Sequence, residues 1–233
     1  MHKVNSLIVM APFYFVLIIT KYALKKEKQM RVFKPWPDRI VRQNTCMNTR
    51  ACAVLVPIIY KNGEEQAVFE VRSSKLGWQP GDVCFPGGRI DDGDESALAA
   101  ALRETKEELG VDASHIHVWG PLDYMESPVG VTVWPFAAYM DTDEFTLSRG
   151  EVDHTFTVPL SWFDGHQPEI GRIELATRPA PDFPKGLALS SQKGWKQRRT
   201  YNVKIYTYEN YKIWGITAHI LDNFRGIRAI IAK

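Results

Sequence analysis

Three glutamates, Glu104, Glu107 and Glu108, are the residues whose types and spacing most directly suggest chemistry. On a helix, positions three and four apart share one face, so the three carboxylates would project together. Like charges at these spacings destabilise a helix by about 0.2–0.5 kcal/mol per pair. Clustered carboxylate oxygens with open coordination positions suit Mg²⁺ or Mn²⁺. The alternative interpretation is a solvated acidic face, relieved by an ion pair between Arg103 and Glu107.

The segment FPGGRIDDGD precedes these glutamates and includes Gly87 and Gly88. A proline and two adjacent glycines predict a sharp backbone turn beside the start of the helix. Such a turn can bring backbone carbonyl oxygens toward the carboxylates. The loop and the acidic face together therefore favour a metal site over a solvated surface.

The helix that must carry the glutamates is predicted over residues 95–109. Asp94 is a good N-cap residue, and Gly110 is placed to end the helix. The leucines of this segment form an apolar stripe on the opposite face, at Leu98, Leu102 and Leu109.

Length and composition describe an ordinary globular protein. The chain has 233 residues, 45% of them hydrophobic and 24% charged, which predicts one domain with attachments. The net charge of +2 divides into +8 over residues 1–50 and −6 over the rest, so the body is acidic and a nucleic-acid partner is not expected. Three cysteines without a paired spacing argue against a disulfide framework and a structural zinc site, and fit a reducing compartment.

The N-terminal residues 1–30 form a separate hydrophobic and basic segment. Residues 7–20 are an almost unbroken apolar run, followed by four lysines, but a full membrane span needs about 20 such residues. We consider membrane association through residues 7–24, a buried helix, or an extension upstream of a true start at Met30. In each case we expect the body, residues 31–233, to lie in the cytoplasm.

The remaining pattern predicts an α/β fold with a mixed β-sheet between helices on both faces. Residues 61–64 have the composition of a hairpin turn, and residues 211–224 show helical spacing. Residues 178–199 lack periodicity and are expected to form a long surface loop. Strands are predicted over residues 51–60, 67–72, 115–125, 131–140, 153–160, 169–177 and 200–208.

At this point the residues resemble a known family, the Nudix hydrolases. The loop and helix carry the pattern of the Nudix box, with Gly88, Glu95, Arg103-Glu104, Glu107-Glu108 and Gly110-Val111. Six residues instead of five separate Gly88 from Glu95, and Thr105 stands where an aliphatic residue is usual. A longer loop is also found in the coenzyme A pyrophosphatase branch of the family. The resemblance implies a Nudix-type α/β/α sandwich, with a core over about residues 50–225.

A second motif of that branch lies upstream of the box. Arg72-Ser73, Gly81 and the Phe85–Gly88 tetrapeptide resemble it at the right spacing, but Gly77 replaces its middle arginine, and Lys75 is a candidate for the missing charge. The resemblance implies hydrolysis of the diphosphate in coenzyme A or its thioesters, to phosphopantetheine and adenosine 3′,5′-bisphosphate. The alternatives are another nucleoside diphosphate derivative, such as ADP-ribose or a dinucleotide, or a nucleotide-sensing module without turnover.

The same resemblance implies the metal ligands. Glu104, Glu107 and Glu108 would hold Mg²⁺ or Mn²⁺, with the Gly88 carbonyl as an additional ligand. Arg103 would orient the carboxylates through a salt bridge, with Glu95 as its candidate partner. The alternative for Arg103 is an ordinary surface ion pair.

Residues outside the helix complete the expected site. Glu151 is our candidate for a further ligand or general base, and a plain loop carboxylate is the alternative. Arg72 would contact a substrate phosphate bidentately, beside the glycine loop with Gly87 and Gly88. A 3′-phosphate would need more basic residues. Four basic residues surround Trp195 in the predicted loop, namely Lys193, Lys196, Arg198 and Arg199. They either contact the 3′-phosphate or form a solvated basic loop.

Overall fold

The computed structural model describes residues 50–231. The chain divides into two compact units, Met1–Cys46 and Met47–Lys233, and every described residue belongs to the second unit. The predictions for residues 1–30, including the membrane association of residues 7–24, therefore fall outside the described residues. Between residues 50 and 231, no helix combines the length and the apolar character needed to cross a membrane.

The sheet begins with a hairpin of β1 (Arg50–Lys61) and β2 (Glu64–Arg72). Its turn lies where the sequence predicts it, with Asn62 at φ 55° and Gly63 at φ 88°. Two successive residues with positive φ match the right-handed twist of the strands, and Asn-Gly is the pair that adopts this turn most readily. The turn fixes the register, with Lys61 opposite Glu64 and Ile58 opposite Ala67.

Within residues 50–231 this sheet has eight strands and is mixed, as the sequence predicts. β7 (Val131–Met140) runs parallel to β1, whereas β5 (Ile116–Pro121) and β8 (Val152–Pro159) run antiparallel to their neighbours β7 and β2. The short strands complete it, namely β3 (Val83–Cys84), β4 (Gly87–Arg89) and β6 (Met125–Ser127).

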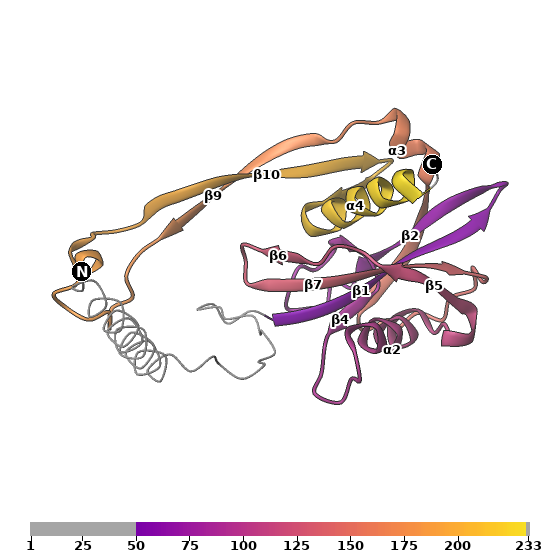
Figure 1. Cartoon of the computed structure of the whole chain (residues 1–233), viewed down its shortest axis with the longest axis horizontal. Coiled ribbons are helices and arrows are strands. Elements are labelled where there is room, and N and C mark those ends of the chain that lie inside the picture. The colour runs from indigo at the N-terminus through magenta and orange to yellow at the C-terminus, as the bar shows by residue number, and fades with distance from the viewer. Residues whose placement is uncertain (1–49, 232–233) are drawn as a thin grey trace, which may run out of the picture. The chain divides into compact units, whose positions relative to one another are not determined.

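The two faces of the sheet are covered by different helices, α2 (Ala97–Leu109) and α4 (Gly215–Ile231) (Figure 1). Side chains alternate along a strand, so neighbouring residues of β2 enter different cores. Val68 packs in a cluster with Leu109 of α2. Phe69 packs in another cluster with Leu221 and Phe224 of α4. The arrangement confirms the predicted α/β/α sandwich.

Only the N-terminal end of α2 differs from the prediction. The helix begins at Ala97, with Ser96 as its N-cap: the Ser96 hydroxyl accepts a hydrogen bond from the amide of Ala99 at 3.1 Å. Asp94 is not the cap, because its carboxylate binds an arginine instead. The predicted end is confirmed, since Gly110 is left-handed (φ 71°) and its amide donates to the Lys106 carbonyl.

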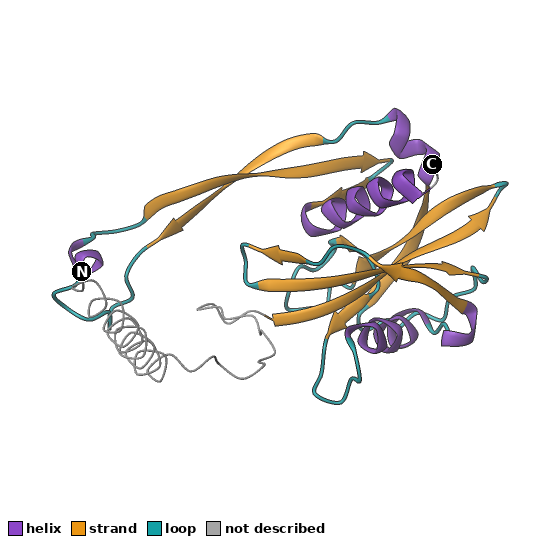
Figure 2. Cartoon of the chain, viewed as in Figure 1, coloured by secondary structure: helices purple, strands orange, loops and turns teal. Residues whose placement is uncertain are grey.

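A second, three-stranded sheet follows the short helix α3 (Leu160–Gly165). Figure 2 shows its two long strands, β9 (Glu169–Thr177) and β10 (Lys196–Tyr208), as an extended hairpin, with the 3₁₀ turn Ala188–Ser191 in the connection. The predicted loop is thus shorter than residues 178–199, because β10 already begins at Lys196.

The closing helix also begins later than predicted. Residues 211–214 are a strand, β11 (Tyr211–Trp214), paired with the end of β10, and α4 starts at Gly215. Glu209 has a positive φ of 51° and forms the turn between the two strands. Ile213 satisfies the helical spacing of the following residues although it lies in a strand, and this misplaced the helix start.

Candidate active site

The glycine loop is held against the first strand of the sheet. β4 pairs with β1 so that Gly87 lies opposite Val54 and Gly88 opposite Ala53. Gly87 has a φ of 147°, and a Cβ at this position would lie 2.3 Å from the carbonyl oxygen of Ala53. Only glycine fits there, because a side chain would need both a disfavoured backbone conformation and space that the strand occupies.

This loop contacts the acidic helix through Glu108. The amide of Gly87 donates a hydrogen bond to Oε2 of Glu108 at 2.8 Å. Glu108 is only 6% exposed. Burial raises the pKa of its carboxyl to about 7, the Gly87 amide opposes that rise, and the carboxylates of Glu104 and Glu151 add to it. The Glu108 carboxyl is thus buried and has other carboxylates as neighbours.

Gly88 lies against Glu104, one turn closer to the start of the helix than Glu108. A Cβ on Gly88 would stand 2.4 Å from the carboxyl carbon of Glu104 and within 2.7 Å of both its oxygens. The backbone therefore approaches this carboxylate more closely than any other residue type would permit. Burial also raises the pKa of Glu104, against the lowering effect of Arg103.

Arg103 joins the loop to the helix. Its guanidinium donates to both oxygens of Asp94, at 3.0 and 2.9 Å, and to the carbonyl of Arg89 at 3.0 Å. It also contacts Glu104 at 2.7 Å and, more loosely, Glu107 at 3.4 Å. The expected salt bridge to the carboxylates is present.

The prediction of Glu95 as the partner of Arg103 is wrong, because the guanidinium pairs with Asp94. Five residues separate Gly88 from Asp94, which is the usual interval of the motif, so the extra residue of this loop lies after the pairing carboxylate. Asp94 also accepts a hydrogen bond from the amide of Asp91 at 2.8 Å. Arg103 first, and this amide second, hold the pKa of Asp94 below its usual range.

The other two predicted carboxylates lie at the edge of the site. The side chain of Glu107 is 55% exposed. Glu151 comes from the turn before β8, and its backbone carbonyl accepts from the amide of Ser73 at 2.8 Å. Its carboxylate lies near enough to raise the pKa values of Glu104 and Glu108. Tertiary structure therefore brings Glu151 beside the acidic helix, 43 residues after Glu108.

One carboxyl of the site is absent from the prediction, that of Glu70. It lies on β2, is 1% exposed, and accepts a hydrogen bond from the thiol of Cys84 at 3.8 Å. Burial and the neighbouring Glu108 raise its pKa well above the usual value. Its Oε1 has no hydrogen-bond partner among the residues that the structure describes. A glutamate inside the apolar strand AVFEVR is the signal that could have identified it.

Arg72, two residues further along the same strand, is a second basic group of the site, besides Arg103. One of its terminal nitrogens donates to the carbonyl of Trp78 at 3.4 Å. Its buried Nε has no hydrogen-bond partner within residues 50–231. The guanidinium lowers the pKa values of Glu70 and Glu108, which places its charge close to both carboxyls.

These residues fit a divalent cation, although no three acidic, histidine or cysteine side chains within residues 50–231 are already grouped as a metal site. The donors are hard carboxylate oxygens, which Mg²⁺ and Mn²⁺ prefer. The glycine backbone leaves no side chain between the loop and Glu104. A partnerless oxygen of Glu70 is buried next to Glu108.

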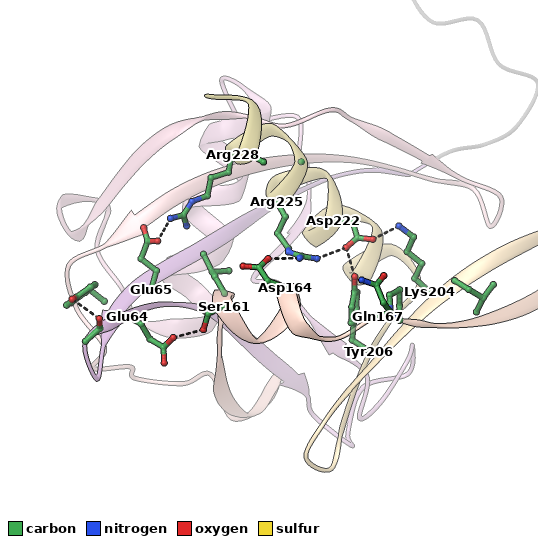
Figure 3. Close-up of a pocket in the computed structure, with 17 residues that line it drawn as sticks. Glu64, Glu65, Ser161, Asp164, Gln167, Lys204, Tyr206, Asp222, Arg225 and Arg228 are labelled. Atoms are coloured by element: carbon green, nitrogen blue, oxygen red, sulfur yellow. Dashed lines mark hydrogen bonds and ion pairs between the residues drawn. The ribbon is translucent and has the colours of Figure 1, made fainter. Parts of the chain in front are cut away.

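The large cavity drawn in Figure 3 lies at the other end of β2 and has a different character. It measures about 1170 Å³, and its charged side chains bind one another. Asp222 accepts from Tyr206 at 2.7 Å and binds Lys204, and Arg225 lies between Asp222 and Asp164. We interpret this network as structural, because it ties α4 to β10 and α3 (Figure 3).

The basic residues around Trp195 lie in the β9–β10 hairpin and contact that hairpin. Arg198 donates to Thr177 at 2.7 Å and to Gln192 at 2.6 Å. The guanidinium of Arg178 lies over the Trp195 ring at 4.9 Å. All four basic side chains are exposed, as expected for the alternative of a solvated basic loop, namely Lys193, Lys196, Arg198 and Arg199.

A mixed sheet between two helices, with a glycine loop fixed against an acidic helix, is the arrangement that the resemblance to the Nudix hydrolases implies. The NUDIX domain family matches residues 49–178, and the chain belongs to this family, as its resemblance predicts.

Two curated proteins are similar to this chain in sequence. The chain is 31% identical over 176 residues to the mitochondrial coenzyme A diphosphatase NUDT8 of Homo sapiens, covering 74% of this chain and 66% of the human protein. It is 33% identical to the uncharacterized Nudix hydrolase NudL of Escherichia coli K12, covering 75% and 81%. A MutT/nudix family protein from Enterococcus faecalis superposes with a TM-score of 0.46 at 15% identity, over 88% of this chain and 70% of that one.

Proposed function

We propose that this protein hydrolyses the diphosphate linkage of coenzyme A or its thioesters, with Mg²⁺ or Mn²⁺ as cofactor. The products would be phosphopantetheine and adenosine 3′,5′-bisphosphate. The observation that carries the proposal is the meeting of the Gly87-Gly88 loop with Glu104 and Glu108, beside the guanidinium of Arg72. The similarity to a coenzyme A diphosphatase supports the choice of substrate.

The carboxylates would hold the metal through Glu104 and Glu108, with Glu107 and the Gly88 carbonyl as further ligands. Bound there, the cation neutralises the diphosphate and lowers the pKa of water. Arg103 keeps the Glu104 carboxylate in place from the side, and the Gly87 amide orients Glu108.

The chain's own residues would then position the reacting groups. Arg72 binds a phosphate oxygen with its guanidinium. A water molecule attacks one phosphorus atom, the bond to the bridging oxygen breaks, and the leaving phosphate keeps the electron pair. Glu151 is our candidate to receive the proton of that water on its carboxylate. Catalysis of this kind depends mainly on positioning and on charge neutralisation.

A substrate panel tests the proposal. The protein would be incubated with Mg²⁺ or Mn²⁺ and with coenzyme A, acetyl-coenzyme A, ADP-ribose or a dinucleoside polyphosphate, and the products separated by chromatography. We expect the coenzyme A compounds to be cleaved at the diphosphate, with the highest kcat/KM. Faster cleavage of ADP-ribose would contradict the substrate, and no turnover of any compound would contradict the hydrolase.

A further inference from the structure

A second cavity, of about 590 Å³, begins beside Arg72. It lies between the loop after β2, the β6 segment and the start of α4. Residues 170, 173 and 201–204 of the β9–β10 hairpin also line it. A volume of this size is typical of sites for small molecules. Apart from Arg72, none of the residues assigned to the metal or to the phosphate lines it.

The lining of this cavity includes apolar side chains that the fold does not cover. Val129 is 56% exposed and Ile173 is 36% exposed. Met125 and Ile216 also line it and are partly buried. Apolar side chains that are exposed together around one cavity indicate a binding surface, whereas single scattered ones are ordinary.

Neutral polar groups are interspersed with these apolar ones, on Ser127, Tyr201 and Asn202. Hydroxyl and amide groups of this kind can donate to and accept from the amides of a ligand. Charged side chains also line the cavity, namely Arg72, Asp82, Glu126 and Lys204. The apolar and neutral polar part of the lining fits an elongated, uncharged chain that carries both methylene and amide groups.

The position of Arg72 connects this cavity to the candidate active site. Arg72 lines the cavity, and so does Cys84, whose thiol donates to Glu70. The same guanidinium lies close to Glu108, as its effect on that carboxyl shows. A diphosphate held at Arg72 would therefore have one of its substituents directed into the cavity.

We propose that this cavity binds the acyl-pantetheine arm of a coenzyme A thioester, and that the enzyme therefore prefers long-chain thioesters to short ones. This inference rests on the proposed function. The amides of the arm meet the polar lining, and the acyl chain meets the exposed apolar side chains. Each methylene removed from water contributes about fourfold to binding when it is fully buried.

The test compares acetyl- with octanoyl-coenzyme A, which differ by six methylene groups. We expect wild-type kcat/KM to be at least tenfold higher for the octanoyl thioester. Ile173→Trp fills the cavity and should lower this octanoyl-to-acetyl ratio at least fivefold, and Val129→Asp should lower it by placing a charge at the apolar wall. Both positions are exposed, so the variants should fold, which circular dichroism would check.

The matched control is Ile230→Trp, the same substitution at a residue of α4 that is 73% exposed and does not line the cavity. It should leave the ratio within twofold of the wild type. Equal rates for both thioesters in the wild type, or a ratio unchanged in Ile173→Trp, would overturn the inference while the proposed function stands.

A binding measurement separates the two proposals. S-octanoyl pantetheine carries no diphosphate, so its binding by calorimetry does not depend on hydrolysis. Binding that Ile173→Trp weakens at least fivefold supports the cavity assignment even if coenzyme A is not the substrate. Absence of binding to the wild type at millimolar concentration would overturn it.

Discussion

Gly88 and Glu104 are in such close contact that a single added carbon would separate them. A Cβ on Gly88 would lie 2.4 Å from the carboxyl carbon of Glu104. The two residues are 16 positions apart in the sequence, and the pairing of β4 with β1 places one against the other. This contact determines where the Glu104 carboxylate lies relative to the backbone of the loop.

We first predict that Gly88→Ala lowers kcat by about 100-fold, because the methyl group displaces the Glu104 carboxylate from the metal. The variant should remain folded, with a lower melting temperature. The matched control is Gly93→Ala in the same loop, where a Cβ would meet nothing within 4 Å. Activity of Gly88→Ala within threefold of the control would contradict a role for this contact.

The second prediction concerns Glu108→Gln. Activity should fall at least 100-fold, because a neutral amide is a poor metal ligand. The amide oxygen can still accept the hydrogen bond from Gly87, and the buried charge is gone, so the metal-free variant should be at least as stable as the wild type at pH 8. Steady-state kinetics and chemical denaturation would measure the two effects, and Glu95→Gln, at an exposed position, is the control.

The stability of the metal-free protein should also depend on pH in a defined direction. The folded-state pKa of Glu108 is about 7, against 4.5 in the unfolded chain. Between these values the folded state binds more protons, so the free energy of unfolding falls as the pH rises, by up to about 3 kcal/mol. Denaturation midpoints between pH 5 and 8 would show this fall, and Glu108→Gln should reduce it. Burial also raises the pKa of Glu70, so this residue should preserve part of the pH dependence of stability in Glu108→Gln.

Metal affinity should show the opposite trend. A ligand must lose its proton before it binds a cation, so affinity for Mn²⁺ should rise between pH 6 and 8 and binding should release protons. Calorimetry in buffers of different ionisation enthalpy would count these protons. Removal of the metal with a chelator should abolish turnover, and Mg²⁺ or Mn²⁺ should restore it. An affinity that does not change across this range would contradict Glu108 as a ligand.

The pairing of Arg103 with Asp94 predicts which of two adjacent carboxylates matters. Asp94→Asn should lower kcat/KM at least tenfold, because Arg103 loses the charge that holds the loop beside the helix. Glu95→Gln should change it less than twofold. Both variants remove one negative charge from neighbouring positions, so the comparison isolates the geometry. Equal effects would show that only the local charge is important.

The acidic helix and its termination at Gly110 could be predicted from the sequence, because the interactions involved are local. A helix fixes the relation of Glu104 to Glu108 through its own hydrogen bonds, and Asn62-Gly63 fixes the first hairpin in the same way. The start of α4 was misplaced where this local logic fails: Ile213 fits the helical spacing, but pairing with β10 makes it part of a strand.

The sequence by itself determined the class of chemistry here, because carboxylates at helical spacing after a glycine loop need no distant residue to be recognised. Only the tertiary structure decided that Asp94 binds Arg103, that Glu70 and Glu151 join the cluster, and that a cavity opens at Arg72. These relations join segments that are far apart along the chain. Their geometry is set by sheet pairing and by burial against the two helices, which no local pattern encodes.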